Sequence, residues 1–161
     1  MKKSKACEKL FCSPGNAGIQ KIAECKFINL KKKVQILNFC NKNSIDLVII
    51  GPEEYLADGL SDYLQDKGIK TFGPVKKAAK LETSKSFAKS FLLKNKILTP
   101  KYRKFTAINK ALDYLNSVNF PIVIKADGLA AGKGVVICKN FNEADQTIKL
   151  IMEKKSLGML E

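Results

Sequence analysis

The sequence has no histidine and only one arginine, Arg103, among its 161 residues. Its five cysteines form no Cys-x-x-Cys pair, and together with the missing histidine this argues against a zinc site. Histidine is also the commonest general base in enzymes. Any catalysis must therefore rest on lysine, carboxylates, backbone amides or a bound metal.

Long apolar runs are missing too. No run approaches the length that spans a membrane, and the start MKKSKACEKLF carries positive charge without a long apolar segment behind it. We therefore expect no secretory signal, no membrane partner and a cytoplasmic protein with reduced thiols. Cys40 and Cys138 lie in apolar patterns, which predicts that they are core residues and not reactive groups.

What the chain has in excess is lysine. It carries 29 basic and 15 acidic residues, a net charge of +14. Nucleic acid is one partner for such a charge, yet arginine, the usual reader of bases, is nearly absent and the lysines are scattered. We favour a solvated lysine-rich surface, whose positive field would also suit a nucleotide substrate. Apolar residues make up 45% of the chain, which is typical of a globular protein.

The first half of the chain predicts a strand–helix–strand unit. A short strand over Lys9–Ser13 ends in the turn PGNAG, and a helix is expected over Lys31–Asn43. The run Ile45–Ile50 is apolar on both faces, as in a buried parallel strand. Apolar residues at helical spacing indicate a helix over Tyr55–Lys67, before a strand over Ile69–Phe72. Such a unit implies a parallel sheet.

The second half predicts two further helices and a strand. Thr83 is expected to cap a helix whose residues Phe87 and Phe91 face inward. The stretch Lys101–Phe105 is predicted to be a strand. Apolar residues over Ile108–Leu115 form a clean helical stripe.

The most distinctive stretch is Ile122–Ile137, IVIKADGLAAGKGVVI, where two β-branched runs flank a loop of small residues. Small residues let backbone amides approach an anion. The glycine spacing fits neither a Walker A loop nor a Rossmann fingerprint. The residues alone leave two interpretations open, a lid over phosphates and an ordinary hairpin with a long loop. The following Asn140–Glu143 resembles a capping box at the start of a helix.

Several motifs together resemble those of one family. KADGLAAGKGVVI looks like the glycine-rich loop of the phosphoribosylamine–glycine ligases, ATP-grasp enzymes of purine biosynthesis. PGNAG (14–18), GPEEYLADGL (51–60), FGP (72–74) and LETSKSFAK (81–89) follow the family's order, so the likeness covers nearly the whole chain. The resemblance implies an α/β fold, with an incomplete Rossmann-like domain over residues 1–80 and the first part of an ATP-grasp domain over residues 81–161.

The resemblance also implies a reaction, in which ATP drives the joining of glycine to 5-phosphoribosylamine through an acyl phosphate. Such chemistry depends on positioning and charge neutralisation. By motif, the ATP-binding residues are Lys85, Lys125, Asp127, Gly128, Leu129, Ala130, Ala131, Gly132, Lys133 and Gly134. The substrate-binding residues are Pro14, Gly15, Asn16, Gly51, Pro52 and Glu53. On the residues alone, we favour a plain turn for PGNAG, and Glu53 can also be a first-turn helix charge.

Two departures from the family pattern bear on activity. Nothing here corresponds to the strand and phosphate loop that precede the segment at Phe11 in the family. The chain also stops at Glu161, before the family's later half with its Mg²⁺ or Mn²⁺ ligands. We therefore expect an internal fragment without metal ligands or ligase turnover of its own. It is either a decayed gene product or one part of a split enzyme that works with a complementing fragment. The alternative is a lysine-rich nucleic-acid-binding remnant.

Overall fold

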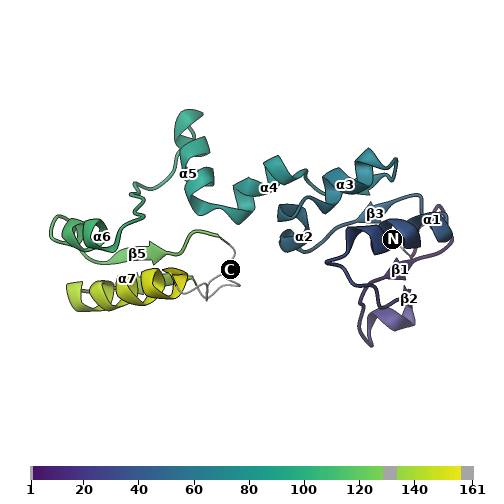
Figure 1. The fold of residues 1–161 in the computed structure, drawn as a ribbon, viewed down its shortest axis with the longest axis horizontal. Coiled ribbons are helices and arrows are strands. Elements are labelled where there is room, and N and C mark those ends of the chain that lie inside the picture. Colours follow the sequence, from purple (N-terminus) through teal and green to yellow (C-terminus); the bar gives the residue numbers. More distant parts are fainter. Residues whose placement is uncertain (1, 129–133, 157–161) are drawn as a thin grey trace. The chain divides into compact units, whose positions relative to one another are not determined.

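The computed structural model describes residues 2–128 and 134–156 and has the α/β class that the sequence predicts (Figure 1). It divides into two compact units, Met1–Lys77 and Ala78–Glu161, which we describe separately. The elements of the first unit are β1 (Phe11–Cys12), the 3-10 helix η1 (Ile19–Lys21), β2 (Glu24–Cys25), α1 (Lys33–Lys42), β3 (Val48–Ile49), α2 (Glu53–Ala57), α3 (Leu60–Asp66) and β4 (Thr71–Phe72). Helix α4 (Lys76–Thr83) crosses from the first unit into the second.

The strands of the first unit form two short parallel pairs, β1 with β2 and β3 with β4. The pairing of β3 with β4 through α2 and α3 confirms the predicted strand–helix–strand unit. The expected burial of β3 on both faces is wrong, because Leu47 and Ile49 are each 47% exposed. Among the described residues β3 has one neighbouring strand, and Ile49 lies opposite the exposed Phe72 in that ladder. Within the predicted strand Ile45–Ile50, only Ile50, just after β3, is buried.

The helix predicted over Tyr55–Lys67 is two helices, α2 and α3, separated at Asp58 and Gly59. Gly59 adopts φ +81°, a left-handed conformation that stops one helix and begins the next. Helix α3 supplies the centre of the core through the fully buried Leu64. Beside it, the buried Ser61 hydroxyl donates to the carbonyl oxygen of Gly73 across 2.9 Å, so that this polar group is satisfied.

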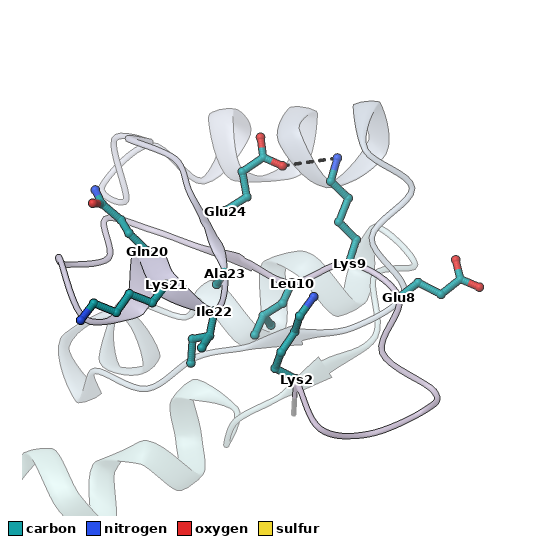
Figure 2. Close-up of a pocket in the computed structure, with 9 residues that line it drawn as sticks. All are labelled: Lys2, Glu8, Lys9, Leu10, Gln20, Lys21, Ile22, Ala23 and Glu24. Atoms are coloured by element: carbon teal, nitrogen blue, oxygen red, sulfur yellow. Dashed lines mark ion pairs between the residues drawn. The ribbon is translucent and has the colours of Figure 1, made fainter.

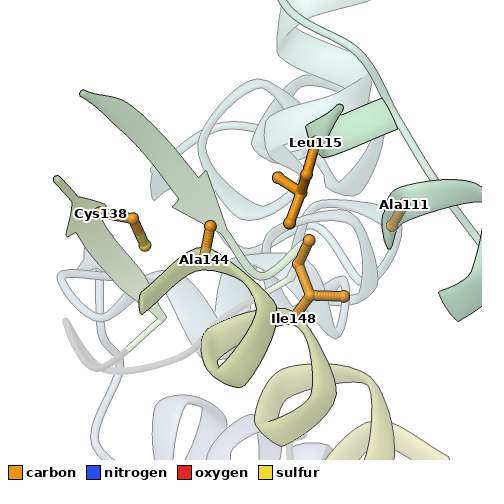
Figure 3. Close-up of a cluster of buried hydrophobic side chains, with 5 residues drawn as sticks. All are labelled: Ala111, Leu115, Cys138, Ala144 and Ile148. Carbon is orange, nitrogen blue, oxygen red and sulfur yellow. The ribbon is translucent and has the colours of Figure 1, made fainter. Parts of the chain in front are cut away.

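The second unit contains α5 (Lys85–Lys94), α6 (Ile108–Leu115), β5 (Ile122–Lys125), β6 (Val135–Cys138) and α7 (Phe141–Ser156). Strands β5 and β6 form an antiparallel hairpin, as predicted. Helices α6 and α7 pack together, and α7 lies against both strands. Their shared core is a cluster of buried side chains drawn in Figure 3: Ala111, Leu115, Cys138, Ala144 and Ile148.

The start of α7 has the predicted capping arrangement. The Glu143 amide donates to Oδ1 of Asn140 across 3.0 Å, and the Lys139 amide donates to Oε2 of Glu143 across 2.8 Å. These bonds satisfy backbone donors that have no partner within the helix.

Two predictions for α5 and its neighbourhood are wrong. Ser84, and not Thr83, caps α5, because its hydroxyl accepts from the Phe87 amide across 3.2 Å. Phe87 and Phe91 are 37% and 40% exposed, and no residue of α5 is buried. Instead of packing through aromatic rings, α5 is bonded through polar side chains to the segment that follows it.

The segment predicted as a strand over Lys101–Phe105 has no ladder partner in the described residues. Side chains of α5 hold it and its approach instead. Lys89 Nζ donates to Oγ1 of Thr99 across 2.6 Å, and the Ser90 hydroxyl lies 3.1 Å from that of Tyr102. Side-chain bonds therefore hold this segment where the sequence predicts a strand.

The described helices include none that is both long enough and apolar enough to cross a membrane. All five cysteines are free. Cys40 is 3% exposed and Cys138 is fully buried, which confirms the prediction that both are core residues.

Candidate functional site

The ends of the glycine-rich loop are fixed by the β5–β6 ladder. Lys125 is the register partner of Val135, and beyond this pair the Ala126 amide donates to the Gly134 carbonyl oxygen across 2.7 Å. Gly128, at φ +101°, has a backbone conformation that glycine favours. The predicted loop residues Leu129, Ala130, Ala131, Gly132 and Lys133 lie outside the described residues.

One face of the hairpin is open. Along β5, Ile122 and Ile124 pack against the core cluster, whereas Val123 and Lys125 alternate with them and are exposed. Ile137, the register partner of Val123, is 65% exposed on the neighbouring strand. The open face is therefore apolar, with a lysine at the end next to the loop. Such a face suits a flat apolar ring system that carries an anionic group.

Lys85 reaches the loop from α5. Its ammonium donates to the carbonyl oxygen of Gly128 across 2.8 Å, although the two residues are 43 positions apart. A cation in the first turn opposes the helix dipole, so its position needs a compensating partner. The structure thus brings two of the predicted ATP-binding residues together at the beginning of the loop.

Asp127 is the centre of a network that sequence reasoning missed. Its Oδ1 accepts from the Ser84 hydroxyl across 3.2 Å and from the Ser86 amide across 3.1 Å, and its Oδ2 accepts from the Ser86 hydroxyl. Lys104 Nζ lies 3.9 Å from Oδ2. The two serines that flank Lys85 are the one visible sign of this network in the sequence. Nothing in the sequence links them to Asp127, because no local period connects residues so far apart.

The surroundings keep Asp127 ionised. Partial burial raises the pKa of this carboxyl, but the hydrogen bonds from Ser86 and Ser84 and the charge of Lys104 outweigh burial. The net pKa therefore lies below its usual range. At neutral pH the group is a hydrogen-bond acceptor only.

The predicted substrate residues of the first unit occupy two loops. In the loop after β1, which contains Pro14, Gly15 has φ +80°, and a Cβ added to it would lie 2.2 Å from Sγ of Cys25. Oδ1 of Asn16 accepts from the Ile19 amide across 2.9 Å, at the start of η1. This loop is therefore closely packed and locally capped.

The second loop follows β3. Gly51 is exposed with open space around its Cα, and Pro52 is the extended residue that precedes α2. Glu53 is the first residue of α2 and is exposed. Its negative charge interacts favourably with the positive N-terminal end of the helix dipole. The two loops follow strands of different two-stranded sheets.

A shallow hollow of about 280 Å³ lies in the first unit, and none of the residues that line it is a predicted site residue (Figure 2). Lys2, Lys9 and Lys21 line it together with Glu8 and Glu24. Lys9 and Glu24 form an ion pair of 3.4 Å beside it, and both side chains are exposed. Solvated ion pairs of this kind contribute little, so the hollow is an ordinary charged surface.

Two family models match adjacent parts of the chain. Residues 1–82 match the N domain of phosphoribosylglycinamide synthetase, and residues 83–161 match its ATP-grasp (A) domain. The chain belongs to the phosphoribosylglycinamide synthetase family. This finding confirms the family that the motifs indicate.

Two relatives of this family show how much of it the chain covers. The phosphoribosylamine–glycine ligase of Clostridium acetobutylicum is 47% identical over 154 residues, which are 96% of this chain and 37% of the relative. That of Fusobacterium nucleatum is 48% identical over 148 residues, or 92% of this chain and 35% of the relative. The chain thus spans little more than a third of the length of these synthetases.

Solved structures agree with the α/β fold. The crystal structure of phosphoribosylamine–glycine ligase from Thermotoga maritima gives a TM-score of 0.70 at 30% identity, over 91% of this chain and 34% of that one. The biotin carboxylase domain of Hydrogenobacter thermophilus 2-oxoglutarate carboxylase, solved with MgADP, gives a TM-score of 0.67 at 21% identity, over 86% and 33%. The second likeness is one of fold alone.

A magnesium site would need several oxygen ligands from side chains such as Asp and Glu. Within residues 2–128 and 134–156, no three His, Cys, Asp or Glu side chains are grouped so that they could hold a metal ion. The carboxylate nearest the loop, Asp127, is already occupied by its serine donors. The described residues therefore do not fit a magnesium site.

Proposed function

We propose that the chain provides the nucleotide-facing part of a phosphoribosylamine–glycine ligase, which joins glycine to 5-phosphoribosylamine using ATP. One observation carries this proposal: Lys125 lies at the loop end of an open apolar hairpin face, and Lys85 is held at the start of the same loop. Phosphoryl transfer requires that phosphate charge is neutralised and the reacting groups are positioned. Two ammonium groups beside a glycine-rich loop supply both.

Each part of the chain has a role in this proposal. The adenine ring lies on the face of Val123 and Ile137, and the phosphates lie under the loop over Gly128–Gly134. The loops with Asn16 and Glu53 contact the glycine and phosphoribosylamine substrates. Residues 1–80 form the substrate-side domain, and residues 81–161 form the first part of the ATP-grasp domain. The two relatives described above are phosphoribosylamine–glycine ligases, which supports the choice of substrates.

We also propose the cytoplasm as the compartment in which the protein works. All five thiols are free, which supports a reducing environment.

The test is an ATP titration of the purified chain, followed by calorimetry or by NMR. We expect dissociation constants in the millimolar range, about 4 kcal/mol of binding free energy. Lys125→Ala should weaken binding roughly tenfold, because a charge-assisted contact is lost. Lys110→Ala, which removes the same charge from the exposed face of α6, should leave binding unchanged.

Two results would contradict the proposal. One is micromolar ATP binding that survives Lys125→Ala, which would place the nucleotide elsewhere. The other is no ATP binding at all. Retention on DNA that falls steeply with salt would then favour a nucleic-acid-binding protein.

A further inference from the structure

The carboxylate of Asp127 receives donors from both sides of Lys85 and from its own neighbour. The Ser84 hydroxyl, the Ser86 amide and the Gly128 amide donate to Oδ1 across 3.2, 3.1 and 3.1 Å. The Ser86 hydroxyl donates to Oδ2. Asp127 is thus bonded to the cap and first turn of α5, and to the first glycine of the loop.

The protons of the two hydroxyl groups fit this arrangement. A serine hydroxyl has one proton to donate and two lone pairs. Ser84 directs its proton at Asp127 and accepts from the Phe87 amide across 3.2 Å. Ser86 directs its proton at Asp127 and accepts from Lys104 Nζ across 3.0 Å. The two hydroxyls also lie 3.3 Å from each other, and an ionised Asp127 gives both of their protons an acceptor.

A second bond interlocks with this network. Lys85 lies between the two serines, and its ammonium donates to the carbonyl oxygen of Gly128, the residue after Asp127. Two consecutive residues at the start of the loop are therefore bonded to three consecutive residues at the start of α5. A displacement of Asp127 would move the carbonyl oxygen that holds Lys85.

We propose that Asp127 is a positioning residue, which fixes the start of the glycine-rich loop to the first turn of α5 and so directs Lys85 and the loop at the nucleotide. This inference rests on the proposed function. Asp127 is unsuited to contact phosphates itself, because its charge would repel theirs and its oxygens are already occupied. Its motif alone predicts direct contact with ATP. In this inference it acts on ATP indirectly, through Lys85 and the loop backbone.

The experiment compares ATP titrations of the full 161-residue chain and its Asp127→Asn variant, with Asp113→Asn as the control. Asp113 lies on the exposed side of α6, so that variant removes the same charge away from the loop. We expect Asp127→Asn to weaken ATP binding roughly fivefold, and Asp113→Asn to leave it unchanged. NMR should also show that the backbone amide signals of Ser86 and Gly128 move in Asp127→Asn, because each loses a carboxylate acceptor.

A double-mutant cycle separates positioning from a general loss of structure. If Asp127 directs Lys85, the effect of Lys85→Ala on ATP binding should shrink in the Asp127→Asn background. The effect of Lys125→Ala should remain the same there, because β5 holds Lys125 independently. If both lysine effects shrink equally, the role is only structural and the inference is overturned. Should Asp127→Asn fail to fold, Ser86→Ala removes one donor without a charge change and takes its place in the cycle.

The remaining outcomes are distinguishable. If the wild-type chain binds ATP through Lys125 but Asp127→Asn binds equally well, the inference is overturned and the proposed function stands. If the Ser86 and Gly128 amide signals do not move, the network does not exist in solution and the inference is overturned on that ground. If the wild-type chain binds no ATP, the proposed function and the inference are overturned together.

Discussion

The Lys85 ammonium and the Gly128 carbonyl oxygen lie 2.8 Å apart, so the first residue of α5 is bonded to the first glycine of the loop. Lys85 is therefore partnered by neutral backbone. A phosphate group offers it a full negative charge, which makes a stronger acceptor. The bond to Gly128 places the ammonium beside the loop, where the proposed nucleotide would offer it that acceptor.

Replacing Lys85 should affect both its bond to Gly128 and its proposed contact with the nucleotide phosphates. We expect Lys85→Met to raise the dissociation constant for ATP roughly tenfold, because it removes a charge-assisted contact. It should also increase amide exchange at Gly128 in the absence of ATP. Lys110→Met, on the exposed face of α6, is the matched control for charge. An affinity equal to that of the wild type would show that Lys85 serves the loop alone.

The Asp127 network should be lost in acid. Its pKa is lowered in the folded chain, so the network stabilises the fold above the unfolded pKa of about 3.9. That stabilisation should be lost as the pH falls through the lower folded pKa. Thermal melts of the wild type and Asp127→Asn should therefore differ at pH 6 and converge as the pH falls below about 4. A difference that stays constant down to the lowest pH at which both are folded would contradict the ionised network.

Two glycines of the first unit form a matched pair for a backbone test. Gly15 and Gly68 have φ +80° and +79°, but a Cβ at Gly68 would meet open space, whereas one at Gly15 would lie 2.2 Å from Sγ of Cys25. Gly68→Ala should cost about 1–2 kcal/mol for the left-handed backbone alone. Gly15→Ala should cost clearly more in denaturant unfolding, and Cys25→Ala should recover part of the difference. Equal costs would mean that the loop after β1 yields to the added methyl group.

The core cluster of the second unit should be sensitive to truncation. Leu115 is 3% exposed within it, whereas Leu150 on α7 is 53% exposed. Leu115→Ala should lower the free energy of unfolding by about 2–5 kcal/mol, since it removes buried apolar contacts and leaves a cavity. Leu150→Ala should change it by less than about 0.5 kcal/mol. Circular dichroism melts of the two variants measure the contrast.

Local periodicity was enough to predict much of the second unit. The stripe over Ile108–Leu115 and the β-branched runs around the glycine-rich loop fold as α6 and the β5–β6 hairpin. The helix depends on the spacing of apolar residues within itself, and the hairpin pairs two strands that are neighbours in the chain. A sequence pattern shows both features directly. The α/β class follows in the same way from alternating strands and helices.

What the sequence could not predict depends on distant partners. Phe87 and Phe91 have the spacing of a buried face, but in the described structure they are 37% and 40% exposed. Extended residues such as those of Lys101–Phe105 become a strand only if another strand pairs with them, and here side chains of α5 hold the segment instead. The Asp127 network joins residues 41 to 43 positions apart, and its two serines look like ordinary helix-start residues.

Each of the two units contains one buried thiol, whose rate of labelling reports how often that unit opens. Cys40 in the first unit and Cys138 in the second are enclosed, whereas Cys7, Cys12 and Cys25 are partly exposed. An alkylating reagent should modify the three accessible thiols quickly and the enclosed pair only when their own unit opens. Burial also raises the pKa of Cys40, which leaves less thiolate to react. Peptide mass spectrometry over a labelling time course would therefore follow the opening of each unit separately, in one sample of the wild-type chain.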